Sequence, residues 1–106
     1  SYKKAIEKIH TPHYEEDRVY PNIIPGWDNS PRRGPGAFIF HKATPALFKK
    51  HVKMILNRIK DKPDEDKVIF LKSWNEWAEG NYMEPDLKWG KGYIRALREA
   101  LEEDAK

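Results

Sequence analysis

Two carboxylates, those of Glu76 and Glu79, lie three positions apart in a segment that also carries two tryptophans. Cleavage or transfer of a glycosidic bond commonly uses two carboxyl groups, one as proton donor and the other as base or nucleophile. The indoles of Trp74 and Trp77 suit the apolar C–H face of a sugar, and an indole N–H can bond its hydroxyls. This combination of residue types indicates sugar chemistry.

The spacing of the two glutamates sets a condition on the backbone. In an extended strand, side chains three positions apart point to opposite faces, whereas a turn or first helical loop aims both at one cavity. We therefore predict a bend after about Asn75. A carboxyl beside buried indoles would have a raised pKa, as a general acid requires. The local sequence leaves an alternative open, in which two exposed loop glutamates adjoin core tryptophans, because surface glutamates are common.

An upstream loop rich in glycine and proline carries a second set of candidate side chains. Trp27 could stack on a sugar, and Asp28 and Asn29 could bond its hydroxyls. The pair Arg32 and Arg33 suits the phosphate or pyrophosphate of a nucleotide-sugar or lipid-linked donor. A solvated, flexible loop is the alternative interpretation of this arginine pair.

Strands are expected directly before both polar segments. The run Val68 to Leu71 is rich in branched and aromatic residues and predicts a strand buried on both faces. The carboxyl end of such a strand is the usual place for an α/β active site. A shorter strand is expected near Asn22 to Ile24, between two prolines. We predict a parallel, right-handed connection between the two strands.

Helical periodicity predicts the remaining elements. Ser1 is expected to cap a helix to Ile9, and Thr44 to cap a longer helix that begins at Pro45 and ends near Lys60. The expected core stripe of the longer helix is Phe48, Val52, Ile55 and Ile59. A final helix from about Lys91 to Glu103 should bury Tyr93, Ile94, Leu97, Ala100 and Leu101.

Composition narrows the class of protein. The chain has 106 residues, with 20 Lys and Arg against 17 Asp and Glu, and a net charge of +3. This small excess argues for no nucleic-acid partner in particular. The absence of cysteine excludes disulfide and thiolate chemistry within the chain. No apolar run approaches the about 20 residues of a membrane span, and no signal peptide is visible, so a cytoplasmic location is the expectation.

Metal binding receives little support from the sequence. His10 and His13 lack a third histidine or a carboxylate at ligand spacing, and we interpret them as surface or loop residues. We expect no metal ion and no other cofactor.

Two motifs carry a resemblance to a known family. Residues 73 to 85 read SWNEWAEGNYMEP, which resembles the signature of the WbsX-type glycosyltransferases of polysaccharide and O-antigen biosynthesis. The same segment is similar to the family 99 glycoside hydrolases, which are endo-α-mannosidases and endo-mannanases. Residues 25 to 34, PGWDNSPRRG, resemble the other characteristic piece of this group. The resemblance extends over most of residues 20 to 101.

The resemblance implies a (β/α)8 barrel, with the two motifs at its last strands and the loops after them. The hydrolase motif NEW-x-EG, in which both glutamates are catalytic, falls on Glu76 and Glu79. It implies a retaining mechanism through a 1,2-anhydro sugar, in which Glu76 assists the sugar's own 2-hydroxyl and Glu79 is acid and later base. Glu84 resembles a third acidic position, a support or substrate contact. Ala78, where the hydrolases commonly carry histidine, and residues 81 to 83 depart from the hydrolase pattern and favour the WbsX side.

A complete barrel of this type needs about 250 residues, so the resemblance implies that residues 1 to 106 are a single α/β fragment from the C-terminal part of such a barrel. Its partners would be a sugar donor and a saccharide acceptor, in lipopolysaccharide, O-antigen or other bacterial surface polysaccharide biosynthesis. Alternatives are a non-catalytic carbohydrate-binding or assembly module and a family 99-like endo-glycosidase. Isolated, the fragment should be nearly inactive and should self-associate through exposed strand edges.

The expected site therefore has Glu76 and Glu79 as its acid–base pair. Asp86, in the loop after residue 85, could also point into it. The residues expected to contact substrate are Trp27, Asp28, Arg32, Trp74, Asn75, Trp77 and Glu84.

Overall fold

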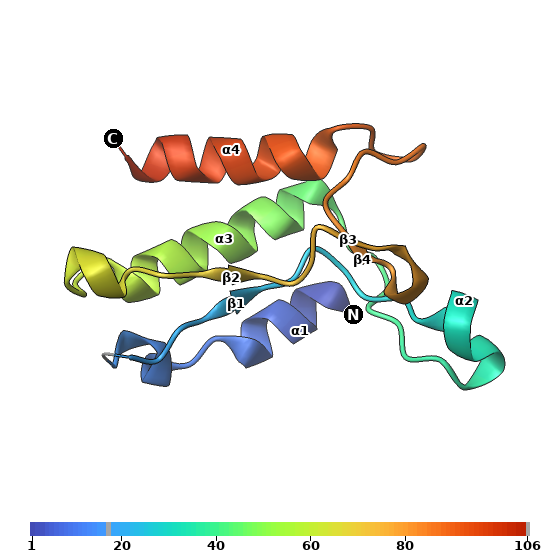
Figure 1. Cartoon of the computed structure of the whole chain (residues 1–106), viewed down its shortest axis with the longest axis horizontal. Coiled ribbons are helices and arrows are strands. Elements are labelled where there is room, and N and C mark those ends of the chain that lie inside the picture. Colours follow the sequence, from blue (N-terminus) through green and yellow to red (C-terminus); the bar gives the residue numbers. More distant parts are fainter. Residues whose placement is uncertain (17, 106) are drawn as a thin grey trace.

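The computed structural model describes residues 1–16 and 18–105, except for the side chains of Pro31 and Arg32. It mixes helices and short strands (Figure 1). The α-helices are α1 (Tyr2–Ile9), α2 (Ser30–Arg33), α3 (Pro45–Ile59) and α4 (Gly92–Asp104). The strands are β1 (Asn22–Ile23), β2 (Phe70–Leu71), β3 (Asn75–Glu76) and β4 (Asn81–Tyr82). Single 3-10 turns are η1 (Pro12–Glu15), η2 (Gly34–Gly36), η3 (Asp64–Asp66) and η4 (Trp77–Glu79).

Capping residues in the local sequence set where α1 and α3 begin. The Thr44 hydroxyl accepts a hydrogen bond from the Leu47 amide at 3.2 Å, and Pro45 occupies the first helical position of α3. The Ser1 hydroxyl accepts from the Lys4 amide at 3.3 Å and caps α1 in the same way. Both predicted caps are therefore confirmed, and α3 ends one residue before the expected Lys60.

The strands form two separate pairs. β1 lies parallel to β2, with Asn22 opposite Phe70 and Ile23 opposite Leu71, and α3 is part of the connection between them. This confirms the predicted parallel connection. β3 and β4 form an antiparallel hairpin around η4, which was not predicted from the sequence.

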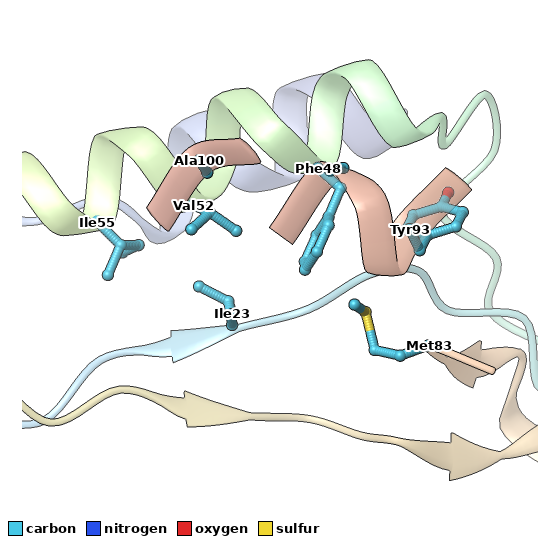
Figure 2. Packing of buried hydrophobic residues seen from close by; sticks show 8 residues of the cluster. Ile23, Phe48, Val52, Ile55, Met83, Tyr93 and Ala100 are labelled. Carbon is cyan, nitrogen blue, oxygen red and sulfur yellow. The ribbon is translucent and has the colours of Figure 1, made fainter. Parts of the chain in front are cut away.

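The core lies between the sheet and the layer formed by α3 and α4, which run side by side (Figures 1 and 2). The predicted stripe of α3 is buried along its whole length. The cluster contains Ile23, Phe48, Val52, Ile55, Met83, Tyr93, Ala96 and Ala100. Removal of these side chains from water is the main force that holds the helices on the sheet.

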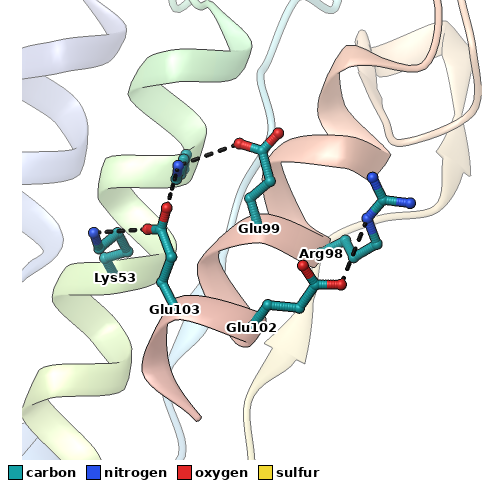
Figure 3. Close-up of polar contacts among 6 residues, drawn as sticks. Lys53, Arg98, Glu99, Glu102 and Glu103 are labelled. Carbon is teal, nitrogen blue, oxygen red and sulfur yellow. Dashed lines mark hydrogen bonds and ion pairs between the residues drawn. The ribbon is translucent and has the colours of Figure 1, made fainter. Parts of the chain in front are cut away.

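Ion pairs connect the exposed sides of α3 and α4 (Figure 3). Lys49 contacts Glu99 at 3.2 Å and Glu103 at 2.8 Å, and Lys53 contacts Glu103 at 2.9 Å. Hydrogen bonds from Lys49 and then Lys53 lower the pKa of Glu103 to about 2. Part of the basic exterior of α3 is therefore neutralised by its neighbouring helix.

The predicted burial of the run from Val68 to Leu71 is wrong. Phe70 is 55% exposed and Val68 is 38% exposed, so the run from Val68 to Leu71 is not buried on both faces. The helices cover one face of the β1–β2 pair (Figure 1), and Ile69 and Leu71 pack against the core on that face. Phe70 stands between them in the sequence and is exposed on the opposite face, because side chains alternate along a strand.

The predicted buried face of α4 is also partly wrong. Leu101 is 47% exposed, whereas Ala96, which was not predicted, is buried. Small alanine side chains at positions 96 and 100 let α4 approach α3 closely. The contact stripe is therefore centred on the alanines rather than on Leu101.

Candidate functional site

The two glutamates lie on a tight hairpin at the carboxyl end of β2. Glu76 ends β3, and Glu79 ends the turn η4 that follows directly. Gly80 then takes a left-handed conformation, with φ of 57°, and the chain returns as β4. The predicted bend after Asn75 is confirmed. Both glutamate side chains are of intermediate exposure and make contacts within the molecule.

The hairpin is fastened to the loop after β1. The Asp28 amide donates to the Glu79 carbonyl oxygen at 2.7 Å. A Cβ atom on Gly80 would lie only 2.7 Å from the Cβ of Asp28 and 2.8 Å from its backbone nitrogen and oxygen. Only glycine permits this approach without displacement of one loop. The two sequence motifs, almost 50 residues apart, are therefore in direct contact.

A buried asparagine holds the base of the hairpin. The Asn81 side chain is fully buried, and its Oδ1 accepts from the Ser73 amide at 3.0 Å. The Ser73 hydroxyl donates to the Asn81 carbonyl oxygen at 2.6 Å and accepts from the Glu76 amide at 3.2 Å. These bonds fix the backbone on which Glu76 is mounted, because each buried polar group would be costly if left unpaired.

The tryptophans of the hairpin are half-exposed rather than buried. Trp74 is 49% and Trp77 is 45% exposed, so the interpretation of them as core residues is wrong, and so is the expectation of a carboxyl beside buried indoles. Trp77 stacks on Tyr82 with ring centroids 3.7 Å apart, and its Nε1 donates to Glu84 Oε1 at 2.8 Å. Glu84 thus orients the Trp77 indole, and Asn75 is an exposed residue of β3.

A cavity of about 270 Å³ adjoins the hairpin. It lies between the loop after β1 and the segment that leads into α4. The predicted Trp27 and Asp28 line it, whereas Glu76 and Glu79 are not among its described lining residues. Its other walls are Pro25, Gly26, Ile39, Phe40, Ala43, Gly80, Tyr82, Asp86, Lys88, Trp89 and Tyr93.

Asp86 organises the polar side of this cavity. Its Oδ2 accepts from the Tyr82 hydroxyl at 2.9 Å, and its Oδ1 accepts from the Trp89 amide at 2.6 Å. Burial and the bond to Asp86 raise the pKa of Tyr82 to about 12, so the phenol remains protonated at neutral pH. Burial, with the charge of Asp86, also raises the pKa of Tyr93.

The upstream loop uses some of its predicted ligands for its own structure. Asp28 Oδ1 accepts from the Ser30 amide at 2.9 Å, and Asn29 Oδ1 accepts from the Phe38 amide at 2.8 Å. Lys72 lies over the Trp27 ring, 5.8 Å from its centroid. The predicted side chain of Arg32 lies outside the described residues, and Arg33 is exposed.

Several cavity residues were not predicted as site residues, and one signal could have found them. Tyr93 was assigned only to the core face of the last helix, yet it also lines the cavity. The signal is the grouping of aromatic side chains around a carboxylate. Tyr82 and Trp89, seven positions apart, flank Asp86 in the same way that tryptophans flank Glu76. Applied to the segment after residue 80, the same reasoning would have selected them.

Other classes of site find no support in the part of the chain that the structure describes. That part holds no group of three or more histidine, cysteine, aspartate or glutamate side chains placed to bind a metal ion. His10 instead contacts the ring of His51, with centroids 5.6 Å apart. Between residues 1 and 105, position 17 excepted, no helix has both the length and the apolar character to cross a membrane.

Comparison with known proteins assigns the family. No solved structure matches the chain. Curated relatives include the uncharacterized protein WxcX of Xanthomonas campestris pv. campestris, from strains B100 and ATCC 33913. Each is 37% identical over 84 residues, and the match covers 78% of this chain but 12% of the relative's length. Residues 1–97 match the family described as Glycosyltransferase WbsX, and the chain therefore belongs to that family, as its two motifs had indicated.

Proposed function

We propose that this chain forms one wall of a glycosyltransferase active site in which Glu76 and Glu79 are the acid–base pair. The observation that carries the proposal is the hairpin at the carboxyl end of β2. Within this hairpin a single 3-10 turn, η4, brings the chain from Glu76 to Glu79. A backbone hydrogen bond connects this turn to the motif that contains Asp28. Membership of the WbsX family supports a role in glycosyl transfer.

The mechanism that we propose follows the family resemblance. Glu76 accepts the proton of the donor sugar's 2-hydroxyl as that oxygen attacks the anomeric carbon, while Glu79 protonates the leaving oxygen. The acceptor hydroxyl then loses its proton to Glu79 and opens the 1,2-anhydro ring, and Glu76 returns its proton to the 2-oxygen. Two displacements at the anomeric carbon give net retention of configuration.

The fold that we propose around this site is the C-terminal part of a (β/α)8 barrel. A parallel pair connected through a helix, with polar loops at the carboxyl strand ends, agrees with such a unit. The exposed face at Phe70 would then be covered by further strands of a longer polypeptide, and the curated relatives are about eight times longer than their matched region. The biological setting that we propose is surface polysaccharide biosynthesis, with O-antigen or lipopolysaccharide as the product and the cytoplasm as the place.

The test is isosteric replacement of each glutamate in the full-length protein. Glu76→Gln and Glu79→Gln keep the side-chain volume but remove the ability to exchange a proton, so transfer of labelled sugar from a panel of nucleotide sugars should fall about 10²–10⁴-fold. Affinity for the donor should change little. Glu65→Gln, at an exposed carboxylate in η3, is the matched control.

A non-catalytic carbohydrate-binding module is the second candidate function, and the half-exposed Trp74 and Trp77 favour it. For such a module, the two glutamine variants would alter affinity or nothing, and no variant would alter turnover. Unchanged transfer by both variants would therefore reject the acid–base pair. Hydrolysis of an internal linkage of a saccharide, with water as the acceptor, would instead identify an endo-glycosidase.

A further inference from the structure

The cavity beside the hairpin is a second place where a ligand could bind, and it does not include the two glutamates among its described walls. Its volume of about 270 Å³ is close to the lower end of small-ligand sites, which is the range for one sugar ring rather than an oligosaccharide. Part of its lining comes from the loop after β1, and another part comes from Asp86, Trp89 and Tyr93.

We propose that this cavity is a saccharide subsite that holds one neutral hexose ring of the substrate. Aromatic walls and convergent oxygen atoms occur together here, as recognition of a hexose requires. The rings of Trp27, Phe40 and Trp89 line the cavity. A lysine ammonium lies over one face of each tryptophan, so the Phe40 ring and the opposite faces of the two indoles are the apolar surface for the C–H face of a pyranose. The carboxylate of Asp86 and the hydroxyls of Tyr82 and Tyr93 offer hydrogen-bond partners for its hydroxyls.

The polar groups are held in place before a ligand arrives. Each oxygen of Asp86 already accepts one hydrogen bond, from Tyr82 at 2.9 Å and from the Trp89 amide at 2.6 Å, and each retains further acceptor capacity. Tyr82 uses its proton for Asp86, so its oxygen is left to accept from a sugar hydroxyl. Tyr93 has no hydrogen-bond partner among the described residues, and its hydroxyl lies at the edge of the core cluster (Figure 2).

The charges of the cavity select against anionic sugars. Asp28 and Asp86 contribute two carboxylates to its lining. Lys88 contributes one cation, whose Nζ lies over the Trp89 ring at 5.1 Å from the centroid, so the carboxylates of the lining outnumber its cation by two to one. A uronic acid or a sugar phosphate would meet like charge in a partly dehydrated space, whereas a neutral hexose would not.

The cavity adjoins the proposed reaction centre, because a residue of its lining is the direct chain neighbour of Glu79. Gly80 lines it and directly follows Glu79, and the amide of the lining residue Asp28 bonds the Glu79 carbonyl oxygen at 2.7 Å. The assignment of the bound ring as a neighbour of the reacting sugar rests on the proposed function. Binding of a neutral hexose to the cavity does not depend on that function.

The test is ligand-detected saturation-transfer NMR on the full-length protein. The probes are the methyl glycosides of glucose, galactose and mannose, with methyl glucuronide as the charged counterpart of the glucoside. At least one neutral glycoside should bind saturably, and the glucuronide should bind at least about tenfold more weakly. Tyr82→Phe keeps the ring that stacks on Trp77 and should weaken binding about three- to tenfold, since it removes one hydroxyl.

A second variant and a control complete the design. Asp86→Asn keeps an acceptor for the Trp89 amide, removes the charge and should weaken binding about tenfold or more. Leu87→Ser, at a fully exposed neighbour, should leave affinity unchanged. Thermal unfolding of each variant establishes that it is folded.

The outcomes separate the two proposals. No saturable binding by any neutral glycoside, or binding that Tyr82→Phe and Asp86→Asn leave unchanged in folded protein, would overturn the subsite. Glu76→Gln and Glu79→Gln should leave glycoside affinity within about twofold, because neither side chain is among the described walls. Cavity binding together with full transfer activity in those variants would reject the catalytic pair and leave the subsite standing.

Discussion

Gly80 occupies the tightest position of the candidate site. Its φ of 57° is one that L-residues rarely adopt, and an added Cβ would lie 2.7 Å from the Cβ of Asp28. Gly90 has nearly the same φ, 56°, but its added Cβ would meet no atom within 4 Å. An added side chain at Gly90 therefore carries only the cost of the left-handed conformation, whereas one at Gly80 carries that cost and a collision with Asp28.

We predict that Gly80→Ala lowers the free energy of unfolding by about 2 kcal/mol or more and reduces transfer activity strongly. Gly90→Ala should cost about 1 kcal/mol, because it carries only the conformational penalty. Chemical denaturation measures both values. Equal losses for the two variants would show that the contact between Gly80 and Asp28 does not constrain the loops.

At the scale of elements, His51 connects α3 to the sheet. It is fully buried, and its Nε2 accepts a hydrogen bond from the Ile24 amide at 3.2 Å, directly after β1. Burial, together with the nearby His10, lowers the pKa of His51 to about 4. Burial and then Arg58 lower the pKa of His10 as well. The imidazole of His51 is therefore neutral in the folded state at neutral pH.

This arrangement predicts acid sensitivity with a definite sign. The side chain of an unfolded histidine has a pKa of about 6.5. Between about pH 6.5 and pH 4 the unfolded chain therefore binds a proton at His51, whereas the folded chain does not. The contribution of His51 is therefore fully present above about pH 6.5 and declines as pH falls toward 4. A fall from pH 7 to pH 5 should therefore lower the free energy of unfolding by about 2 kcal/mol through His51 alone.

Denaturant unfolding at several pH values checks this prediction. His51→Gln, which can still accept from the Ile24 amide, should reduce the pH dependence over this range. His13→Gln is the control, because His13 is exposed and paired with Glu16 at 2.8 Å. An unchanged pH dependence in His51→Gln would contradict a neutral, buried His51.

The elements that sequence predicted well are those whose signals are local. Thr44, Pro45 and the apolar stripe of α3 define its start and buried face within 15 residues. The β3–β4 hairpin was missed because Asn75 to Tyr82 lack alternating apolar residues, and their pairing depends on the buried Asn81 and the turn at Gly80. The cavity was missed because its walls come from three separate segments, residues 25–28, 39–43 and 80–93, and spacing along the sequence does not show that these segments meet.

At the scale of the whole molecule, the β1–β2 pair leaves one apolar face open. Phe70 is 55% and Tyr20 is 36% exposed, and their rings contact each other at 6.3 Å between centroids. The local run from Val68 to Leu71 predicted burial on both faces, but burial depends on what other segments cover, which the run itself does not contain. Exposed apolar patches of this kind are typical of interaction surfaces.

We predict that residues 1–106 expressed alone self-associate through this face. Phe70→Lys should shift the chain toward monomer, because it places a charge at the centre of the face. Leu101→Lys, at a similarly exposed position on α4 (47%), should not. Sedimentation velocity measures the distribution. A monomer in the unmodified chain, or equal effects of the two variants, would contradict the prediction.

The hydrogen bond between the Asp28 amide and the Glu79 carbonyl oxygen has a consequence for how rate depends on substrate length. A saccharide long enough to fill the cavity would restrain Asp28 and, through this bond, the backbone that carries Glu79. Interaction energy from a sugar ring that does not react would then be used to align the one that does. Extension of the substrate by one neutral hexose should therefore raise kcat and not only lower KM.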